Sequence, residues 1–278
     1  MTFSRERIGM SKLNLAVLAA LCAAMVLPAF TRVPQAAAPA ANSPDPKLVE
    51  DLVYANRILY DQGVVDAFGH VSAREDQQPN RFLLARSVAP ALVTKADILE
   101  FDKNGEPIDA RGRAVYLERF IHAAIYRARP DVKAIVHSHS PAVIPFGVTG
   151  TILRPIYHMS AFLGAGAPVF EIRNGAGMTN MLITDNKLGD ALAKTLGDGT
   201  VVLMRGHGSV AVGESIPQVV HRAIYTEINA RLQAEAAGLG PINFLTPEEA
   251  AKADAQTDSQ ASLSRPWEMW KSRIGKIE

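Results

Sequence analysis

The chain has 278 residues, of which 48% are hydrophobic and 21% are charged, a composition typical of a globular protein that buries a sizeable core. Its 29 lysines and arginines nearly balance its 28 aspartates and glutamates, which leaves a formal net charge of +1. No strong electrostatic field is therefore present to attract DNA or RNA, and we expect no nucleic-acid partner.

The first 40 residues differ in kind from the rest of the chain. Three basic residues precede an apolar run at 13–30, and small residues follow up to Ala40. This order is typical of a secretory signal peptide. We predict cleavage near Ala40, a periplasmic or secreted protein, and no stable membrane association after cleavage. Because the apolar run is long, an uncleaved membrane anchor is the alternative.

The only cysteine, Cys22, lies inside this apolar run. Its surroundings are not those of a lipoprotein site, so no lipid anchor is expected. The processed chain would contain no thiol and no disulfide, which is compatible with an oxidising compartment.

The main domain is predicted to span 47–240, after a short linker at 41–46. The spacing of apolar residues predicts a first helix that ends at Gly63. Residues 69–75 and 81–86 have the composition of strands, and the polar turn "DQQPN" between them predicts a hairpin.

A second helix is predicted from about Ala114 to Pro130, whose ring ends it, and an apolar strand that ends in "VHSH" follows. Another helix at about 187–196 ends at a glycine, and the strand "TVVLMRGHG" comes next. Ser215 and Gln218 have the spacing of a capping box, so a further helix is expected to begin there.

Strands and helices alternate, but the hairpin argues against a purely parallel sheet. We therefore predict the α/β class, with helical layers around a mixed sheet. Residues 241–278 are predicted to form a C-terminal helical extension that is polar apart from Trp267 and Trp270. These indoles need a cover, for which a neighbouring subunit is a candidate.

His137 and His139 lie two residues apart at the end of a strand, so their imidazoles project from the same face. This arrangement suits a metal ion, although one core histidine and one surface histidine would give the same pattern. His207 lies between two glycines at the end of another apolar strand, where the backbone can turn sharply and approach closely. A third imidazole can thus reach the same point.

Glu118 and His122 are one helical turn apart on the predicted helix before the first of these strands. A helix packed against that strand can direct Glu118 into the same pocket. Three histidines with an open coordination position and a nearby carboxylate describe a catalytic metal site better than a structural one.

The motifs "GHVSAR", "ERFIHAAIYRARPDVKAIVHSHS" and "VVLMRGHGSVAVG" together resemble those of the class II aldolase/adducin family, over about 48–238. The resemblance implies a three-layer α/β/α sandwich with a central mixed, largely antiparallel sheet. It implies one divalent metal ion per subunit, held by His137, His139 and His207, with Glu118 as the catalytic carboxylate. Zinc is the expected metal, and manganese, iron and cobalt are alternatives.

The resemblance also implies cleavage of a carbon–carbon bond next to a carbonyl. A divalent cation stabilises the enolate that such cleavage leaves, while a carboxylate moves the proton. Because decarboxylation shares this intermediate, we predict a metal-dependent lyase that acts by retro-aldol cleavage or decarboxylation. An epimerase or dehydratase on the same metal site is one alternative. A non-catalytic module like the adducin head is another, although that head lacks the metal histidines.

Two departures from the sugar-phosphate aldolases concern the substrate. These enzymes have Gly-Asn where this chain has Gly69 and His70, so we predict a catalytic role for His70, with a surface histidine as the alternative. Their phosphate loop is replaced by "LLARSVAPALVT", where Arg86 suits a carboxylate or a structural salt bridge. We predict a small non-phosphorylated hydroxy carbonyl compound or hydroxy acid, including aromatic acids, bound by Arg86, Ser87 and Ser72.

The family's acid tyrosine reaches the active site from another subunit. An ungapped count from His139 puts His158 at its position, with Tyr157 adjacent. Either side chain is a candidate to protonate the carbanion, and Tyr157 can equally belong to the core. The expected partners are thus a small-molecule substrate and further copies of the chain in a homo-oligomer, with a tetramer favoured.

Overall fold

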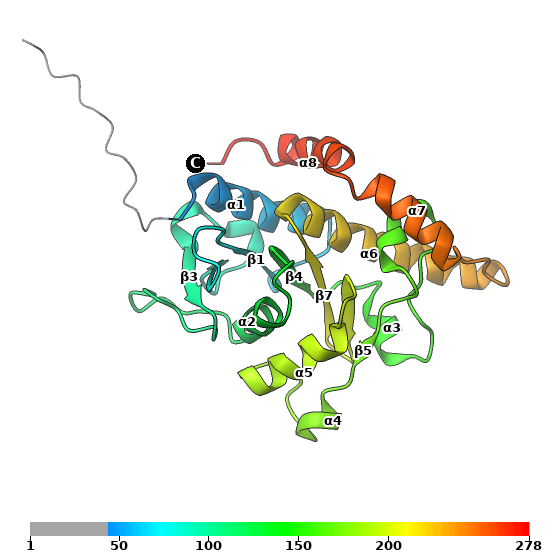
Figure 1. Ribbon diagram of the computed structural model, residues 1–278, viewed down its shortest axis with the longest axis horizontal. Coiled ribbons are helices and arrows are strands. Elements are labelled where there is room, and N and C mark those ends of the chain that lie inside the picture. Colours follow the sequence, from blue (N-terminus) through cyan, green and yellow to red (C-terminus); the bar gives the residue numbers. More distant parts are fainter. Residues whose placement is uncertain (1–43, 278) are drawn as a thin grey trace, which may run out of the picture. The chain divides into compact units, whose positions relative to one another are not determined.

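The computed structural model describes residues 44–277 (Figure 1). The predicted signal peptide at 1–40 and the first half of the predicted linker, 41–43, lie outside the described residues. Among the helices that the structure describes, none is both long enough and apolar enough to span a membrane.

A seven-stranded sheet forms the middle layer, in the order β3-β2-β1-β4-β7-β6-β5. All neighbouring strands are antiparallel except β5 and β6. The strands are β1 (His70–Arg74), β2 (Arg81–Ala85), β3 (Ile98–Asp102), β4 (Ala134–Ser138), β5 (Val169–Phe170), β6 (Val201–Met204) and β7 (Gly208–Gly213). The predicted mixed, largely antiparallel sheet is confirmed, and β1 and β2 form the predicted hairpin.

Helices cover both faces of this sheet, as Figure 1 shows. On β4, Val136 faces a core shared with α1, α6 and α8, whereas Ile135 faces a second core shared with α2 and α5. The helices are α1 (Pro46–Asp61), α2 (Arg119–Ala128), α3 (Ile144–Val148), α4 (Arg173–Ala176), α5 (Asn186–Leu196), α6 (Ile216–Leu239), α7 (Pro247–Thr257) and α8 (Gln260–Ile274). Two helical layers around one sheet make the predicted α/β/α sandwich.

Local sequence signals explain several of these boundaries. The side chain of Ser215 accepts a hydrogen bond from the backbone N–H of Gln218 and so caps α6, as predicted. Asp185 caps α5 in the same way, and Gly197 ends that helix with a positive φ of 53°.

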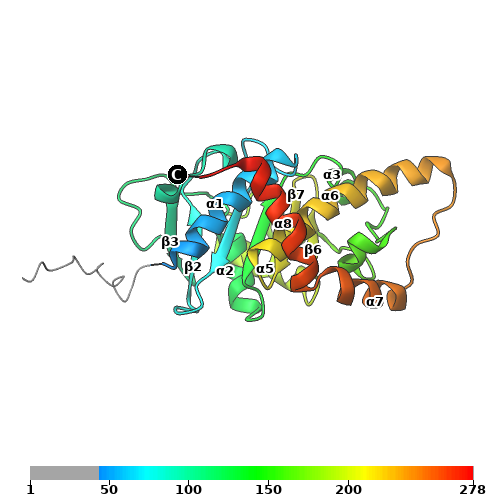
Figure 2. The same ribbon diagram turned by 90° about the horizontal axis from the view of Figure 1, so that it is seen from above.

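The two tryptophans of α8 are covered by their own chain. Trp267 is 5% exposed and Trp270 is 4% exposed, because α8 lies along α1 and α6 (Figure 2). The expectation that a neighbouring subunit covers these indoles is therefore wrong. Helix α8 belongs to the outer layer of the sandwich.

Because Trp267 is buried in this core, Trp267→Ala is expected to lower the free energy of unfolding by about 3–5 kcal/mol. The matched control is Met269→Ala on the same helix, where the side chain is 52% exposed and little change is expected. Urea unfolding measures both variants. Equal unfolding midpoints for Trp267→Ala and the unmodified protein would show that α8 does not contribute to the core.

Candidate active site

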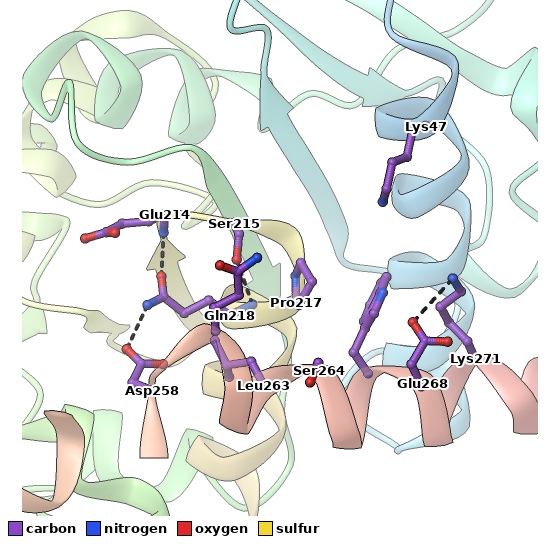
Figure 3. Close-up of a pocket in the computed structure, with 12 residues that line it drawn as sticks. Lys47, Glu214, Ser215, Pro217, Gln218, Asp258, Leu263, Ser264, Glu268 and Lys271 are labelled. Atoms are coloured by element: carbon purple, nitrogen blue, oxygen red, sulfur yellow. Dashed lines mark hydrogen bonds and ion pairs between the residues drawn. The ribbon is translucent and has the colours of Figure 1, made fainter. Parts of the chain in front are cut away.

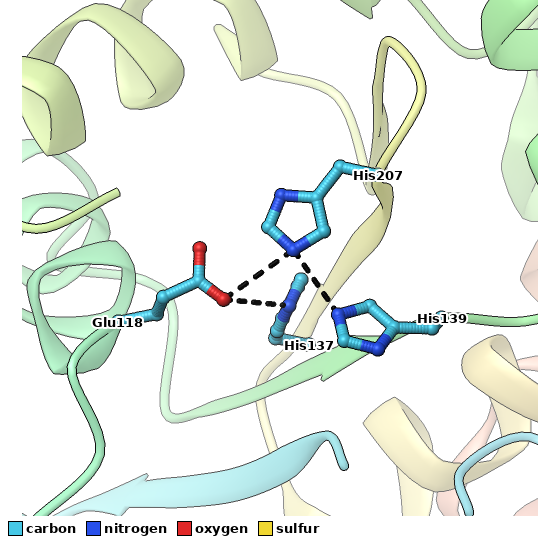
Figure 4. A group of neighbouring side chains, drawn as sticks. All are labelled: Glu118, His137, His139 and His207. Atoms are coloured by element: carbon cyan, nitrogen blue, oxygen red, sulfur yellow. Dashed lines mark hydrogen bonds and ion pairs between the residues drawn. The ribbon is translucent and has the colours of Figure 1, made fainter. Parts of the chain in front are cut away.

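Four side chains converge at one end of the central strands (Figure 4), namely Glu118, His137, His139 and His207. Their candidate ligand atoms all lie within 4.8 Å of one another. His137 belongs to β4 and His139 follows that strand, while His207 occupies the turn between β6 and β7. The structure thus brings together all four residues that the sequence analysis assigned to the metal and the catalytic carboxylate.

The turn that carries His207 requires glycine on both sides. Gly206 has a φ of +63°, a region that side chains other than glycine rarely adopt. A Cβ atom on Gly208 would collide with the carbonyl oxygen of Ser138 on the neighbouring strand. The two glycines therefore allow the close approach of the strands that the sequence predicted.

The nitrogen and oxygen atoms of the cluster face one another. The Nε2 atoms of His207 and His139 are 3.1 Å apart. Oε2 of Glu118 lies 3.3 Å from Nε2 of His207 and 3.5 Å from Nε2 of His137. Imidazole nitrogens and a carboxylate oxygen that converge at these distances are the arrangement that a metal ion satisfies.

The orientation of His137 supports this interpretation. Its Nδ1 lies 3.1 Å from the carbonyl oxygen of Ser209, which can only accept a hydrogen bond, so Nδ1 carries the proton. Its Nε2 is buried and has no hydrogen-bond partner among the described residues. A backbone carbonyl commonly orients a metal-binding imidazole in this way. The residues present therefore fit a divalent cation.

Glu118 is held in its ionised form. Its Oε1 accepts a hydrogen bond of 2.9 Å from the backbone N–H of Ile183. Burial alone would raise the pKa of Glu118, but the adjacent imidazoles of His137 and His207 outweigh burial and hold that pKa well below its usual range. Burial and the two neighbouring histidines lower the pKa of His139 to about 4, so this imidazole is neutral near pH 7.

The helix after Glu118 begins later than predicted. Helix α2 starts at Arg119, so Glu118 precedes the helix instead of lying on one of its faces. The backbone before it is drawn away from the helical conformation, because the N–H of Ser87 donates to the carbonyl of Ala114 and the Tyr116 hydroxyl donates to a backbone carbonyl. Tertiary hydrogen bonds thus override the helical pattern of this segment.

His70 lies beside the cluster and is only 3% exposed. Its Cα pairs with that of His137 across β1 and β4, and the two ring centroids are 5.1 Å apart. The Tyr116 ring packs on its other side, with centroids 4.6 Å apart. The alternative of a surface histidine is therefore wrong.

Ser72 lies behind His70 and is completely buried. Its Oγ is 2.6 Å from Nδ1 of His122 and 2.8 Å from the Tyr126 hydroxyl. This position does not favour the predicted contact with a substrate, because the hydroxyl is already shared between two side chains. Ser72 instead holds His122.

Arg86 lies just after β2 and forms an ion pair with Asp97, with 2.6 Å between its Nε and Oδ1 of the carboxylate. The structural salt bridge that was the alternative for Arg86 is therefore present. The side chain is nevertheless 36% exposed, and its two terminal nitrogens have no hydrogen-bond partner among the described residues. Ser87 is exposed. Substrate binding by both residues stays a prediction.

Tyr157 and His158 lie at the start of a 3₁₀ helix (His158–Leu163), and within the described chain neither shares a hydrogen bond or a ring contact with the four-residue cluster. His158 is exposed, whereas the Tyr157 hydroxyl is buried without a partner among the described residues. Burial raises the pKa of Tyr157. Their predicted role as acids requires a second subunit and stays a prediction.

Several groups that surround the cluster were not identified from the sequence. Ile183 and Ser209 act through backbone atoms, which leave no trace in a side-chain pattern. Tyr116 and Tyr126 are side chains whose position depends on tertiary packing. The one available signal was His122, a polar residue within the otherwise apolar face of α2.

A separate cavity of about 580 Å³ lies between α1, α8 and the start of α6, and contains none of the four cluster residues (Figure 3). Gln218 is one of its paired polar groups: it donates to Asp258 at 2.8 Å and accepts from the N–H of Glu214. The chemistry of this cavity is less distinctive than that of the histidine cluster.

Comparison with known proteins decides the family. The family model of the Class II Aldolase and Adducin N-terminal domain matches residues 50–234. The chain belongs to this family. A decarboxylase, tropJ, of Talaromyces stipitatus is 37% identical over 252 residues, which cover 82% of this chain and 94% of that protein.

Two further relatives support the assignment. A 3,4-dihydroxyphthalate decarboxylase of Terrabacter sp. is 31% identical over 209 residues, which cover 70% of this chain and 83% of that protein. The structure of an L-fuculose 1-phosphate aldolase from Glaciozyma antarctica superposes with a TM-score of 0.68 at 25% identity, over 82% of this chain and 88% of that chain. The predicted fold and the predicted lyase class are confirmed.

Proposed function

We propose that this lyase is a divalent-metal-dependent decarboxylase of an aromatic acid that carries a hydroxyl group next to its carboxylate. The observation that carries the proposal is the cluster of three imidazoles with Glu118, in which Nε2 of His137 is buried without a partner among the described residues. Two relatives named as decarboxylases support the reaction, and one is named for 3,4-dihydroxyphthalate, an acid of this class.

The imidazoles of His137, His139 and His207 would hold the metal ion, and zinc suits three nitrogen ligands with an open fourth position. A bound divalent cation supplies positive charge that stabilises the electron pair left on the substrate when the carboxylate departs. Glu118 is ionised and faces the same point, so it can carry a proton between substrate atoms.

Apolar side chains beside the cluster support an aromatic substrate. The ring centroids of Phe68 and His139 are 6.3 Å apart, and Phe68 is 65% exposed. Leu117, which precedes Glu118, is 60% exposed. An exposed apolar surface at the edge of a polar site is typical of a place where a flat apolar ligand binds.

The test is a substrate panel on zinc-loaded protein, with carbon dioxide and aldehyde release measured in parallel. Release of carbon dioxide from 2,3-dihydroxybenzoate or 3,4-dihydroxyphthalate is expected, and 3,4-dihydroxybenzoate, which has no hydroxyl next to the carboxylate, serves as the control. Aldehyde release from hydroxy carbonyl compounds, with no carbon dioxide from any aromatic acid, would favour retro-aldol cleavage instead.

Arg86→Ala is expected to weaken the binding of an aromatic carboxylate by about 1.5–3 kcal/mol, the range for a hydrogen bond to a charged group. Arg81→Ala is the matched control, since Arg81 lies at the other end of β2, has a side chain that is 35% exposed and pairs with the carboxylate of Glu100. Calorimetric titration with the product catechol and with the acid separates carboxylate binding from ring binding. Tight binding of sugar phosphates, unchanged by Arg86→Ala, would contradict the role of Arg86.

We also propose a periplasmic or secreted homo-oligomer, with a tetramer favoured and with Tyr157 or His158 reaching the site of a neighbouring subunit. The order of basic, apolar and small residues in the first 40 positions supports export. His158 is exposed, so its imidazole is accessible to a neighbouring subunit, which supports a contact between subunits. N-terminal sequencing and light scattering test these proposals, and an intact N-terminus on a monomer would refute both.

A further inference from the structure

Four buried polar side chains form a row that leads from the edge of the cluster into the protein, and none of them is more than 5% exposed. Nδ1 of His70 lies 2.7 Å from Nε2 of His122. On the other side of that ring, Nδ1 lies 2.6 Å from Oγ of Ser72, which in turn is 2.8 Å from the Tyr126 hydroxyl. Each member therefore touches the next through a hydrogen bond.

The Tyr126 end of this row determines which group donates in each of its hydrogen bonds. The Tyr126 hydroxyl also lies 3.5 Å from the carbonyl oxygen of Lys133, and a carbonyl can only accept. When Tyr126 donates to Lys133, Ser72 must donate to Tyr126. His122 then donates from Nδ1 to Ser72, and its Nε2 becomes an acceptor.

The direction fixes the tautomer of His70. Because Nε2 of His122 accepts, His70 donates from Nδ1, and its own Nε2 carries a lone pair. Nε2 of His70 has no hydrogen-bond partner among the described residues, and it is not among the fully buried unpaired atoms. The imidazole thus presents a free acceptor beside the four-residue cluster.

We propose that His70 accepts the hydroxyl proton of the aromatic substrate, and that His122, Ser72 and Tyr126 are positioning residues that keep its Nε2 unprotonated. The hydroxyl next to the carboxylate is the group concerned. The substrate in this inference rests on the proposed function, whereas the tautomer of His70 does not.

The step needs no reactant other than the substrate and the side chains of the site. The O–H bond of the substrate breaks, its electron pair stays on the oxygen, and the proton forms a bond to Nε2 of His70. The bond between the ring carbon and the carboxylate then breaks, its electron pair stays on the ring carbon, and carbon dioxide leaves. Glu118 carries the proton from Nε2 of His70 to that carbon, so both side chains end in their starting states and the product leaves as a phenolate.

The tautomer is measured on zinc-loaded protein with isotope-labelled histidine, by proton–nitrogen correlation spectra of the imidazole rings. The variant His70→Asn assigns the His70 signals by their loss. We expect a proton on Nδ1 of His70 and none on Nε2. A proton on Nε2 in the unmodified protein would overturn the inference.

Tyr126→Phe tests the positioning residues, because it removes the hydroxyl that donates to Lys133. Ser72 can then donate to His122, which reverses the row and puts the proton of His70 on Nε2. We expect the nitrogen signals of His70 to change accordingly, and kcat to fall by about 10²-fold with little change in KM, within the range for a misplaced general base. Tyr54→Phe is the control, since Tyr54 is buried at 9% exposure in the other core.

The outcomes separate this inference from the proposed function. If no aromatic acid releases carbon dioxide, the proposed function fails, while the spectra still report the tautomer of His70. If Tyr126→Phe lowers kcat but leaves the tautomer unchanged, Tyr126 is only structural and the inference fails. It also fails if neither quantity changes.

Discussion

Replacement of any one of His137, His139 and His207 by alanine is expected to remove most of the bound metal and, with it, nearly all activity. Each variant leaves only two imidazoles, and a zinc site with an open position needs three protein ligands. His137→Ala should remove as much metal as His139→Ala or His207→Ala, although His137 is only 1% exposed. Metal analysis of the purified variants measures the effect.

The control for these variants is His221→Ala. His221 is also 1% exposed but lies on α6, outside the cluster. This variant should retain the metal of the unmodified protein, which separates loss of a ligand from general damage to the core. A cluster variant that folds and keeps its full metal content would contradict the assignment of that histidine.

Glu118→Gln is expected to retain the metal while turnover falls by about 10²- to 10⁴-fold, the usual contribution of a general base. Glutamine keeps the size of the side chain and its Oε1 can still accept from Ile183, but it cannot take up a proton. Turnover and metal content are measured on the same sample. Glu75→Gln is the matched control, since Glu75 is 5% exposed and lies just beyond the opposite end of β1.

The two measurements on Glu118→Gln distinguish its possible roles. Loss of metal together with turnover would make Glu118 a ligand, which its distances of 3.3 and 3.5 Å to two imidazole nitrogens allow. Retention of full metal and full turnover would contradict a catalytic role. Only loss of turnover alone agrees with Glu118 as the proton carrier.

The parts of the fold that depend on local pattern could be predicted from the sequence. The hairpin of β1 and β2 follows from two apolar runs around a polar turn, and the start of α6 follows from the spacing of Ser215 and Gln218. The convergence of the three histidines could be predicted because His137 and His139 share a strand face and His207 lies between glycines.

The features that could not be predicted depend on contacts between distant segments. Helix α2 starts late because Ser87 binds the backbone of Ala114, a contact that no helical pattern reveals. Trp267 is covered because α8 returns to α1, more than 200 residues earlier in the chain. The buried row behind His70 joins β1 to α2, so its members are far apart in sequence and carry no common motif.

Decarboxylation at the three-histidine site is tested most directly by release of carbon dioxide from a carboxyl-labelled 2,3-dihydroxybenzoate, using protein stripped of metal with a chelator and then reloaded with Zn²⁺. We expect no labelled carbon dioxide from the stripped protein, recovery of its release on reloading, and no recovery in His137→Ala at the same Zn²⁺ concentration. Equal release by stripped and reloaded protein, or recovery in the variant, would contradict decarboxylation at the three-histidine site.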